Sequence, residues 1–211
     1  MNNKSVDIDQ LVDFDVFEIA LIDYLNDNYS EDYIIEQLRL NINGENRVKK
    51  GLRIVNKVII KSPLNNFLMD NKVEILQALK NKNDKQIILV SLLNTAFSFA
   101  FYLQRIFGKF FNVQDVVSIK VIQKEISKVY GGNRVAVNGV YCVGPIFEKA
   151  EIYSKEGMGL YRFPGKKVLV SKIAKTLLKE SFKHNNQTKE IQDYELLDPY
   201  FNFIVDVEMS N

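Results

Sequence analysis

The chain is poor in the residues on which many catalytic and metal sites depend. Its 211 residues include one cysteine, Cys142, one histidine, His184, four prolines and no tryptophan. A single cysteine excludes an intramolecular disulfide framework and is typical of a reducing compartment. A single histidine argues against a His-based metal site or a Ser-His-Asp triad. The start of the chain lacks the charged, apolar and small-residue pattern of a signal peptide, so we expect a cytoplasmic protein.

Motifs for phosphate and cation binding are incomplete. The stretch "GLYRFPGKK", residues 159–167, has five residues between its glycines, and Lys167 stands where a P-loop needs Ser or Thr. An acidic run near the start lacks the glycine and the terminal glutamate of a calcium loop and is typical of a solvated face. It consists of Asp7, Asp9, Asp13 and Asp15. We therefore expect no enzyme activity, and no catalytic residues, metal, cofactor or small-molecule substrate.

Charge is segregated along the chain although the net charge is only +2. Residues 1–44 carry ten acidic and two basic side chains, a net charge of −8. Residues 45–62 have a net charge of +5, residues 105–190 have +9, and residues 191–211 return to −5. A basic block between acidic ends is typical of a nucleic-acid-binding surface, and solvated helix faces can produce the same pattern.

Apolar residues recur at helical spacing over most of the chain, which predicts a mainly α fold. We expect an N-terminal helical bundle over residues 1–112. Residues 113–211 are expected to hold a winged-helix region, a C-terminal helix and a docking tail. The individual helices are predicted over residues 14–40 with Ser30 as an internal N-cap, 46–60, 115–129 and 168–183.

The run "QIILVSLLNTAFSFAFYLQ", residues 86–104, has nineteen residues and no charge. Its length is borderline for a membrane span of about 20 residues. Its polar residues form one narrow stripe at helical spacing: Ser91, Asn94, Thr95 and Ser98. A helix that is apolar nearly all round is also typical of the centre of a bundle. We predict one buried core helix here, and a membrane span is the less favoured alternative.

The stretch "YGGNRVAVNGVYC", residues 130–142, allows two structures. Asn138-Gly139 between alternating apolar residues is a strong hairpin signal. Apolar residues from Ala136 to Ala150 also recur at intervals of four and three, as in a helix capped by Asn133 after the Gly131-Gly132 turn. Asn138-Gly139 and Gly144-Pro145 are poor helix material, so local physics does not decide between the two.

The flanking segments follow the order of a winged helix-turn-helix. Before this stretch, a predicted helix carries a lysine stripe at i, i+4 and i+8. After it, "EIYSKEGMGLYRF" predicts a short hairpin of two apolar-aromatic runs joined by Lys155-Glu156-Gly157. In such modules the second helix of the turn lies in the major groove, and contacts to phosphates set its register.

The arrangement resembles the BrxA family, the small accessory proteins of BREX phage-defence systems. The segments that carry the resemblance are "NRVKKGLRIVNKVIIKSPL", the apolar run 86–104, "YGGNRVAVNGVYCVGPIFEKAEIY" and "LLDPYFNFIV". The resemblance implies a helical bundle with a winged helix-turn-helix, no catalytic activity, binding to double-stranded DNA, and work alongside other defence-system subunits. With this weight added we favour a helix over 133–150, kinked or interrupted near Gly144-Pro145.

We therefore expect a non-catalytic protein that binds double-stranded DNA. Phosphates are assigned to Lys120, Lys124, Lys128, Lys166 and Lys167, the groove to Asn133, Arg134 and Asn138, and the wing to Lys155 and Arg162. The alternative is a protein-protein interaction scaffold that uses the winged helix as a docking surface. An exposed aromatic patch of Tyr130, Tyr141 and Tyr153 would favour the scaffold, and a continuous positive surface would favour DNA.

Overall fold

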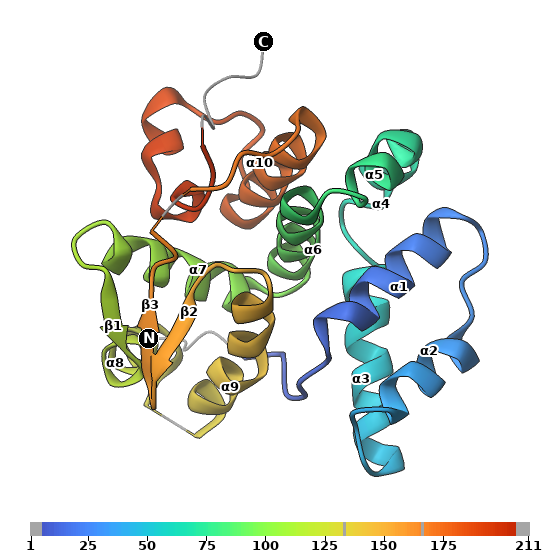
Figure 1. The fold of residues 1–211 in the computed structure, drawn as a ribbon, viewed down its shortest axis with the longest axis horizontal. Helices are drawn as coiled ribbons and strands as arrows, with labels where there is room; N and C mark the ends of the chain where they lie inside the picture. The colour runs from blue at the N-terminus through green and yellow to red at the C-terminus, as the bar shows by residue number, and fades with distance from the viewer. Residues whose placement is uncertain (1–5, 133, 166, 206–211) are drawn as a thin grey trace.

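The computed structural model describes residues 6–132, 134–165 and 167–205. The fold is mainly helical with one small antiparallel sheet, as expected. Buried apolar side chains from Ile8 to Ile204 form one contiguous core. Figure 1 shows α6 near the centre, with α1 to α3 on one side and α8 and the sheet on the other.

The N-terminal part is a helical layer. Its helices are α1 (Phe14–Leu25), α2 (Glu31–Arg39) and α3 (Glu45–Val58). The side chain of Ser30 accepts a hydrogen bond from the backbone N–H of Tyr33 at 3.4 Å, which confirms Ser30 as an N-cap. An extended segment, residues 6–13, precedes α1 and lies between α3 and α9.

The apolar run 86–104 is divided between two helices, so the prediction of one helix is wrong. After the short helices α4 (Asn65–Asp70) and α5 (Lys72–Ala78), α6 (Lys82–Ala96) ends at Phe97 and α7 (Ser98–Phe111) begins there. Phe97 is extended, with φ −132° and ψ 104°. The hydroxyl of Thr95 donates to the carbonyl of Ser91 at 2.8 Å, a back-bond that bends helices. Among the described residues, no helix combines the length and apolarity needed to cross a bilayer.

Three short strands form the sheet. They are β1 (Val116–Ser118), β2 (Ser154–Gly157) and β3 (Leu160–Arg162), in the spatial order β1-β3-β2 with both pairings antiparallel. The predicted helix over 115–129 therefore starts late, because Val116 to Ser118 pair with β3. Helix α8 runs from Ile119 to Tyr130.

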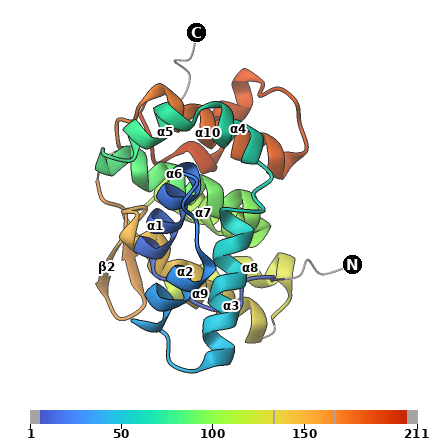
Figure 2. The ribbon, with the colours of Figure 1, turned by 90° about the vertical axis from the view of Figure 1, so that its right-hand side faces the viewer.

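The C-terminal elements pack on α6 and α7. Helix α10 (Lys172–Asn186) is followed by two 3-10 turns, η1 (Asp193–Leu197) and η2 (Pro199–Phe201). It starts later than the predicted 168–183, because the backbone of Val168 pairs with the tail at Ile204. Both Figure 1 and Figure 2 place the C-terminal elements at the opposite end of the molecule from α9 (Arg134–Lys149).

A buried polar network holds this C-terminal part in place. The side-chain amide of Asn94 donates to Oε1 of Gln104 at 2.6 Å, and the amide of Gln104 donates to the carbonyl of Tyr200 at 2.9 Å. The hydroxyl of Ser181 donates to the carbonyl of Ser91 at 2.9 Å. Ser91 and Asn94 of the predicted polar stripe therefore connect α6 to α7, α10 and η2 through buried hydrogen bonds. Thr95 bonds within α6, and Ser98 is exposed.

Candidate nucleic-acid interface

Residues 134–149 form the helix α9, so the helical interpretation of this stretch is correct and the Asn-Gly hairpin does not form. Of the expected kink or interruption near Gly144-Pro145, the interruption is absent, because the helix runs through Pro145 to Lys149. A proline in a helix interior costs about 3 kcal/mol. Complete burial of Ile146 and Phe147, worth roughly 1.5–3 kcal/mol each, offsets that cost.

The two glycines that weakened the helical prediction permit close packing. A Cβ on Gly139 would lie 2.8 Å from two ring carbons of Phe99 in α7. A Cβ on Gly144 would lie 2.9 Å from the hydroxyl of Tyr153, which donates to the carbonyl of Gly144 at 2.6 Å. The same residues that lower helix propensity therefore allow α9 to approach its neighbours.

The solvent-facing side of α9 carries a polar and aromatic stripe. Arg134, Asn138 and Tyr141 follow one another at i, i+4 and i+7, and all three are exposed. Tyr141 is 59% exposed, so its ring is available to a partner. Val135, 52% exposed, lies beside this stripe. Arg and Asn are residue types that make bidentate contacts with base edges in a major groove.

Helix α8 supplies a basic surface beside α9. The side chain of Ser118 caps the helix by accepting a hydrogen bond from the N–H of Val121 at 3.4 Å, and the helix ends at Gly131, with φ 79°. Its buried face consists of Ile122, Ile126 and Tyr130. The predicted lysine stripe lies on the opposite face, where Lys120, Lys124 and Lys128 are exposed.

The three lysines of α8 differ in their partners. Lys128 forms an ion pair with Glu125, and this contact holds the pKa of the Glu125 carboxyl below its usual range. Lys109 of α7 lies 3.9 Å from the same carboxylate. Neither Lys120 nor Lys124 forms a salt bridge with a residue that the structure describes. These two lysines therefore keep their charge available.

A groove separates α8 from α9, with a volume of about 280 Å³. Lys120 and Lys124 stand on its α8 side together with Gln123, and Val137 lies on its α9 side. The turn at Gly131 and Gly132 closes one end of the groove. Lys120 and Lys124, which form no salt bridge with a described residue, thus border the space next to the exposed stripe of α9.

The predicted hairpin forms as β2 and β3, but its turn lies at Met158-Gly159, because Lys155-Glu156-Gly157 belong to β2. Its turn requires Gly159, because φ is +70° there and a Cβ would lie 2.9 Å from Cγ2 of Ile119. Met158 at the turn is fully exposed. Lys155 forms a 2.5 Å ion pair with Glu148 of α9, and Arg162 pairs with Glu156. Both cations of the hairpin are therefore neutralised within the protein.

The predicted site residues fall into four groups. Lys120, Lys124, Arg134 and Asn138 share one surface and form no salt bridge with a described residue; Lys128, Lys155 and Arg162 lie near it in ion pairs. Lys167 is exposed but precedes Val168, whose N–H donates to Phe203 in the tail, so the chain here leads away from α9. Asn133 and Lys166 lie outside the described residues.

Two exposed residues beside this surface, Tyr141 and Met158, were not among the residues predicted to contact DNA. The helical spacing from Arg134 through Asn138 points to position 141, so Tyr141 could have been found. The aromatic patch considered above does not form, because Tyr130 and Tyr153 are only 2% and 1% exposed.

Two titratable groups near this surface, Cys142 and Tyr130, are buried. Burial raises the pKa of the Cys142 thiol to about 11, so the thiol stays protonated and is a poor nucleophile at neutral pH. Burial likewise raises the pKa of Tyr130 to about 12. Among residues 6–132, 134–165 and 167–205, no group of three His, Cys, Asp or Glu side chains is placed to hold a metal ion.

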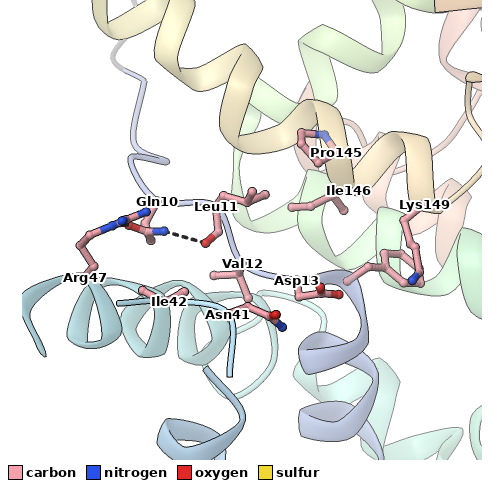
Figure 3. Close-up of a pocket in the computed structure, with 11 residues that line it drawn as sticks. Gln10, Leu11, Val12, Asp13, Asn41, Ile42, Arg47, Pro145, Ile146 and Lys149 are labelled. Atoms are coloured by element: carbon pink, nitrogen blue, oxygen red, sulfur yellow. Dashed lines mark hydrogen bonds between the residues drawn. The ribbon is translucent and has the colours of Figure 1, made fainter. Parts of the chain in front are cut away.

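A second cavity, of about 270 Å³, lies at the other side of α9. It is bounded by the 6–13 segment, the α2–α3 turn and Pro145, Ile146 and Lys149 of α9 (Figure 3). Nε of Arg47 donates to Oε1 of Gln10 at 3.1 Å across this space. The cavity therefore marks the junction between α9 and the N-terminal helices.

No family model matches the chain, and neither a curated protein nor a solved structure matches it. The similarity to BrxA proteins thus rests on the quoted sequence segments alone.

Proposed function

We propose that the segment from α7 to β3 is a winged helix-turn-helix, and that the protein binds double-stranded DNA through α9 without catalysis. The order helix, strand, helix, helix, strand, strand supports this, as does the strand order β1-β3-β2. On this proposal α7 is the first helix of the module, so the boundary between bundle and winged helix falls near Phe97 rather than at residue 112.

One observation carries the proposal most strongly. The exposed face of α9 offers Arg134, Asn138 and Tyr141 beside Lys120 and Lys124 of α8. On the second helix of the turn, which is α9 here, side chains of this kind fit base edges. Cations on the preceding helix, α8, fit phosphates. The ion pairs on Lys128, Lys155 and Arg162 leave few cations for phosphates, so the expected salt dependence is modest.

The expected salt slope follows from the count of available cations. Lys120 and Lys124 supply two phosphate-binding charges. Each neutralised phosphate contributes about −0.9 to the slope of log K against log salt, so the slope for duplex DNA is about −2. We further propose that this binding serves an accessory role in a cytoplasmic BREX-like phage-defence assembly, which the resemblance to BrxA proteins supports.

The test is fluorescence anisotropy of a labelled random duplex at several salt concentrations. The variant Lys120→Gln/Lys124→Gln should weaken binding and make the slope shallower by about 2. The matched control Lys172→Gln/Lys189→Gln removes two exposed positive charges that do not line the α8–α9 groove and should change affinity less than about threefold. Equal losses in both variants would contradict the assignment of the site.

A second candidate function is docking of a protein partner on the same surface. The fully exposed Met158 at the tip of the hairpin, with the partly exposed Leu160 next to it, favours this candidate. Folded wild-type protein that fails to bind duplex DNA at low salt would replace the DNA proposal with the docking proposal.

A further inference from the structure

The extended segment 6–13, which we call the acidic strap, has two different faces. Ile8, Gln10 and Val12 are buried, whereas Asp7 and Asp9 point to the outside. This alternation is that of an extended chain lying on a surface. The buried side chains hold the strap in place, and the carboxylates of Asp7 and Asp9 face the solvent, where they can form ion pairs.

The strap carboxylates lie on a basic stripe of α3. Asp9 forms 2.8 Å ion pairs with both Lys50 and Arg53, and Asp7 pairs with Lys57. The hydrogen bond from Lys50 lowers the pKa of the Asp9 carboxyl, so Asp9 stays charged at neutral pH. The stripe follows one face of the helix, since its members lie at i, i+3 and i+7.

Like the phosphates of a nucleic-acid backbone, the strap carboxylates are negative charges at regular spacing. Two carboxylates two residues apart in an extended chain are spaced regularly, at roughly 6.6 Å along the chain. They meet cations that keep substantial contact with solvent, because the side chains of Lys50 and Arg53 are 50% and 64% exposed. Exposed ion pairs of this kind are weak and are readily exchanged for another anion.

Lys57 has a different role from the other two cations. Its ammonium lies 4.3 Å from the centroid of the Phe97 ring, at the junction of α6 and α7. A cation held over an aromatic ring contributes to the fold. The cations that a new anion can reach are therefore Lys50 and Arg53.

The strap also connects this stripe to α9. Val6 lies against Gly139 in the middle of α9, and the strap passes between α9 and α3 in Figure 3. Leu11, Arg47 and Ile146 line the same cavity from the strap, α3 and α9. A duplex bound on α9 would thus have the α3 stripe as its neighbour across the strap.

We propose that Lys50 and Arg53 of α3 form a second surface for the phosphate backbone of duplex DNA, covered in the free protein by the carboxylates of the acidic strap. This inference rests on the proposed DNA binding and extends it to a surface outside the winged helix. Phosphates replace Asp9 as the partner of Lys50 and Arg53, while Ile8 and Val12 keep the strap in place and Asp7 remains beside Lys57. The strap carboxylates thereby weaken DNA binding by the wild-type protein.

The expected effect can be calculated from counterion release. Two additional phosphate contacts make the salt slope steeper by about 1.8, which corresponds to at most ~60-fold in affinity at 0.1 M salt relative to 1 M. We expect the variant Asp7→Asn/Asp9→Asn to bind a random duplex about tenfold more tightly than wild type at 0.1 M salt.

The experiment compares three variants with wild type by anisotropy. Asp7→Asn/Asp9→Asn removes the covering charges, and Asp32→Asn/Glu36→Gln makes the same change in net charge on the exposed face of α2. The third variant adds Lys50→Gln/Arg53→Gln to the first. Thermal unfolding of each variant verifies that it is folded.

The proposal is supported if only the strap variant gains affinity and slope, and if the added α3 changes abolish the gain. It is overturned if the strap variant and the α2 control gain equally, or if the gain survives without Lys50 and Arg53. Wild-type binding that depends on Lys120 and Lys124, combined with an ineffective strap variant, would refute this inference and leave the proposed function intact. Failure of every variant to bind would refute both, whereas a gain in the strap variant that is insensitive to Lys120→Gln/Lys124→Gln would refute only the α9 site.

Discussion

The close approach of α9 to α7 predicts that Gly139→Ala destabilises the protein although alanine is the better helix former. In the interior of a helix, Gly→Ala is favourable by about 1 kcal/mol. At position 139 the new methyl group would lie 2.7 Å from Cγ1 of Val6 and 2.8 Å from the Phe99 ring. Overpacking of a core typically costs about 1–3 kcal/mol.

The rigidity of the Phe99 ring decides which effect is larger. Phe99 is fully buried, and its ring meets that of Tyr130 edge to face with centroids 5.1 Å apart. Val6 is only partly buried at the start of the strap, whereas the Phe99 ring is enclosed by the core. The steric cost therefore exceeds the gain in propensity, and we expect Gly139→Ala to lower the free energy of unfolding by about 1–2 kcal/mol.

A matched substitution at Gly51 in α3 separates the two effects. There the nearest neighbour of an added Cβ is the flexible end of Leu38, at 3.1 Å. Gly51→Ala should leave stability unchanged or raise it by up to about 1 kcal/mol. Urea unfolding of both variants measures the difference.

A double-mutant cycle identifies the clashing partner. In a Phe99→Leu background, Gly139→Ala should lose most of its cost, with a coupling energy of about 1 kcal/mol. Gly139→Ala that is as stabilising as Gly51→Ala, or that adds simply to Phe99→Leu, would refute the packing of α9 against α7.

Three further predictions test other parts of the structure. Asn138→Ala should stabilise the protein by about 0.5 kcal/mol in urea unfolding because position 138 is an exposed helical site; destabilisation would instead indicate the Asn-Gly hairpin turn. Asp198→Ala should cost about 2 kcal/mol, because Asp198 accepts from the N–H of Tyr200 at 2.9 Å and from Nε of Arg105 at 2.9 Å; an unchanged midpoint would show that the tail is not docked this way. Burial raises the pKa of Tyr130 and Tyr200 to about 12, so the folded state retains phenol protons that the unfolded chain loses above pH ~10. Stability should therefore be constant up to pH ~10 and fall between pH 10 and 12, less steeply in Tyr130→Phe, and a flat profile in wild type would contradict the burial of these phenols.

The prediction of a helix over 133–150 was correct, although the local helix propensities of this stretch are poor. Asn138-Gly139 and Gly144-Pro145 are unfavourable for a helix, and local physics left the hairpin open. The reason for the glycines is tertiary, because they admit Phe99 and Tyr153, which are distant in sequence. Such close approaches cannot be read from a window of neighbouring residues.

The boundaries of other elements depended on partners that a single sequence does not reveal. The break at Phe97 follows hydroxyl back-bonds and a polar network whose partners lie in α10 and the tail. The start of α8 at Ile119 follows pairing of β1 with β3. Both features depend on contacts between distant segments of the chain.

The basic residues of the candidate site show the same division. Pairing of Lys128 with Glu125 is visible at i, i+3 in the sequence, and it could have been anticipated. Pairing of Lys155 with Glu148 joins the β2–β3 hairpin to α9 and requires the folded structure. Charge patterns thus located the basic region, and tertiary ion pairs decided which cations remain available.

The claim that α9 lies against duplex DNA is tested most directly by site-specific crosslinking. A photoreactive phenylalanine analogue is placed at Tyr141, which is 59% exposed on α9, and in a second protein at Tyr194, which is 72% exposed in η1 at the far end of the molecule. We expect that position 141 crosslinks a random duplex, that added salt suppresses the product, and that position 194 does not crosslink. Duplex binding with crosslinks at position 194 and none at position 141 would contradict the placement of DNA on α9.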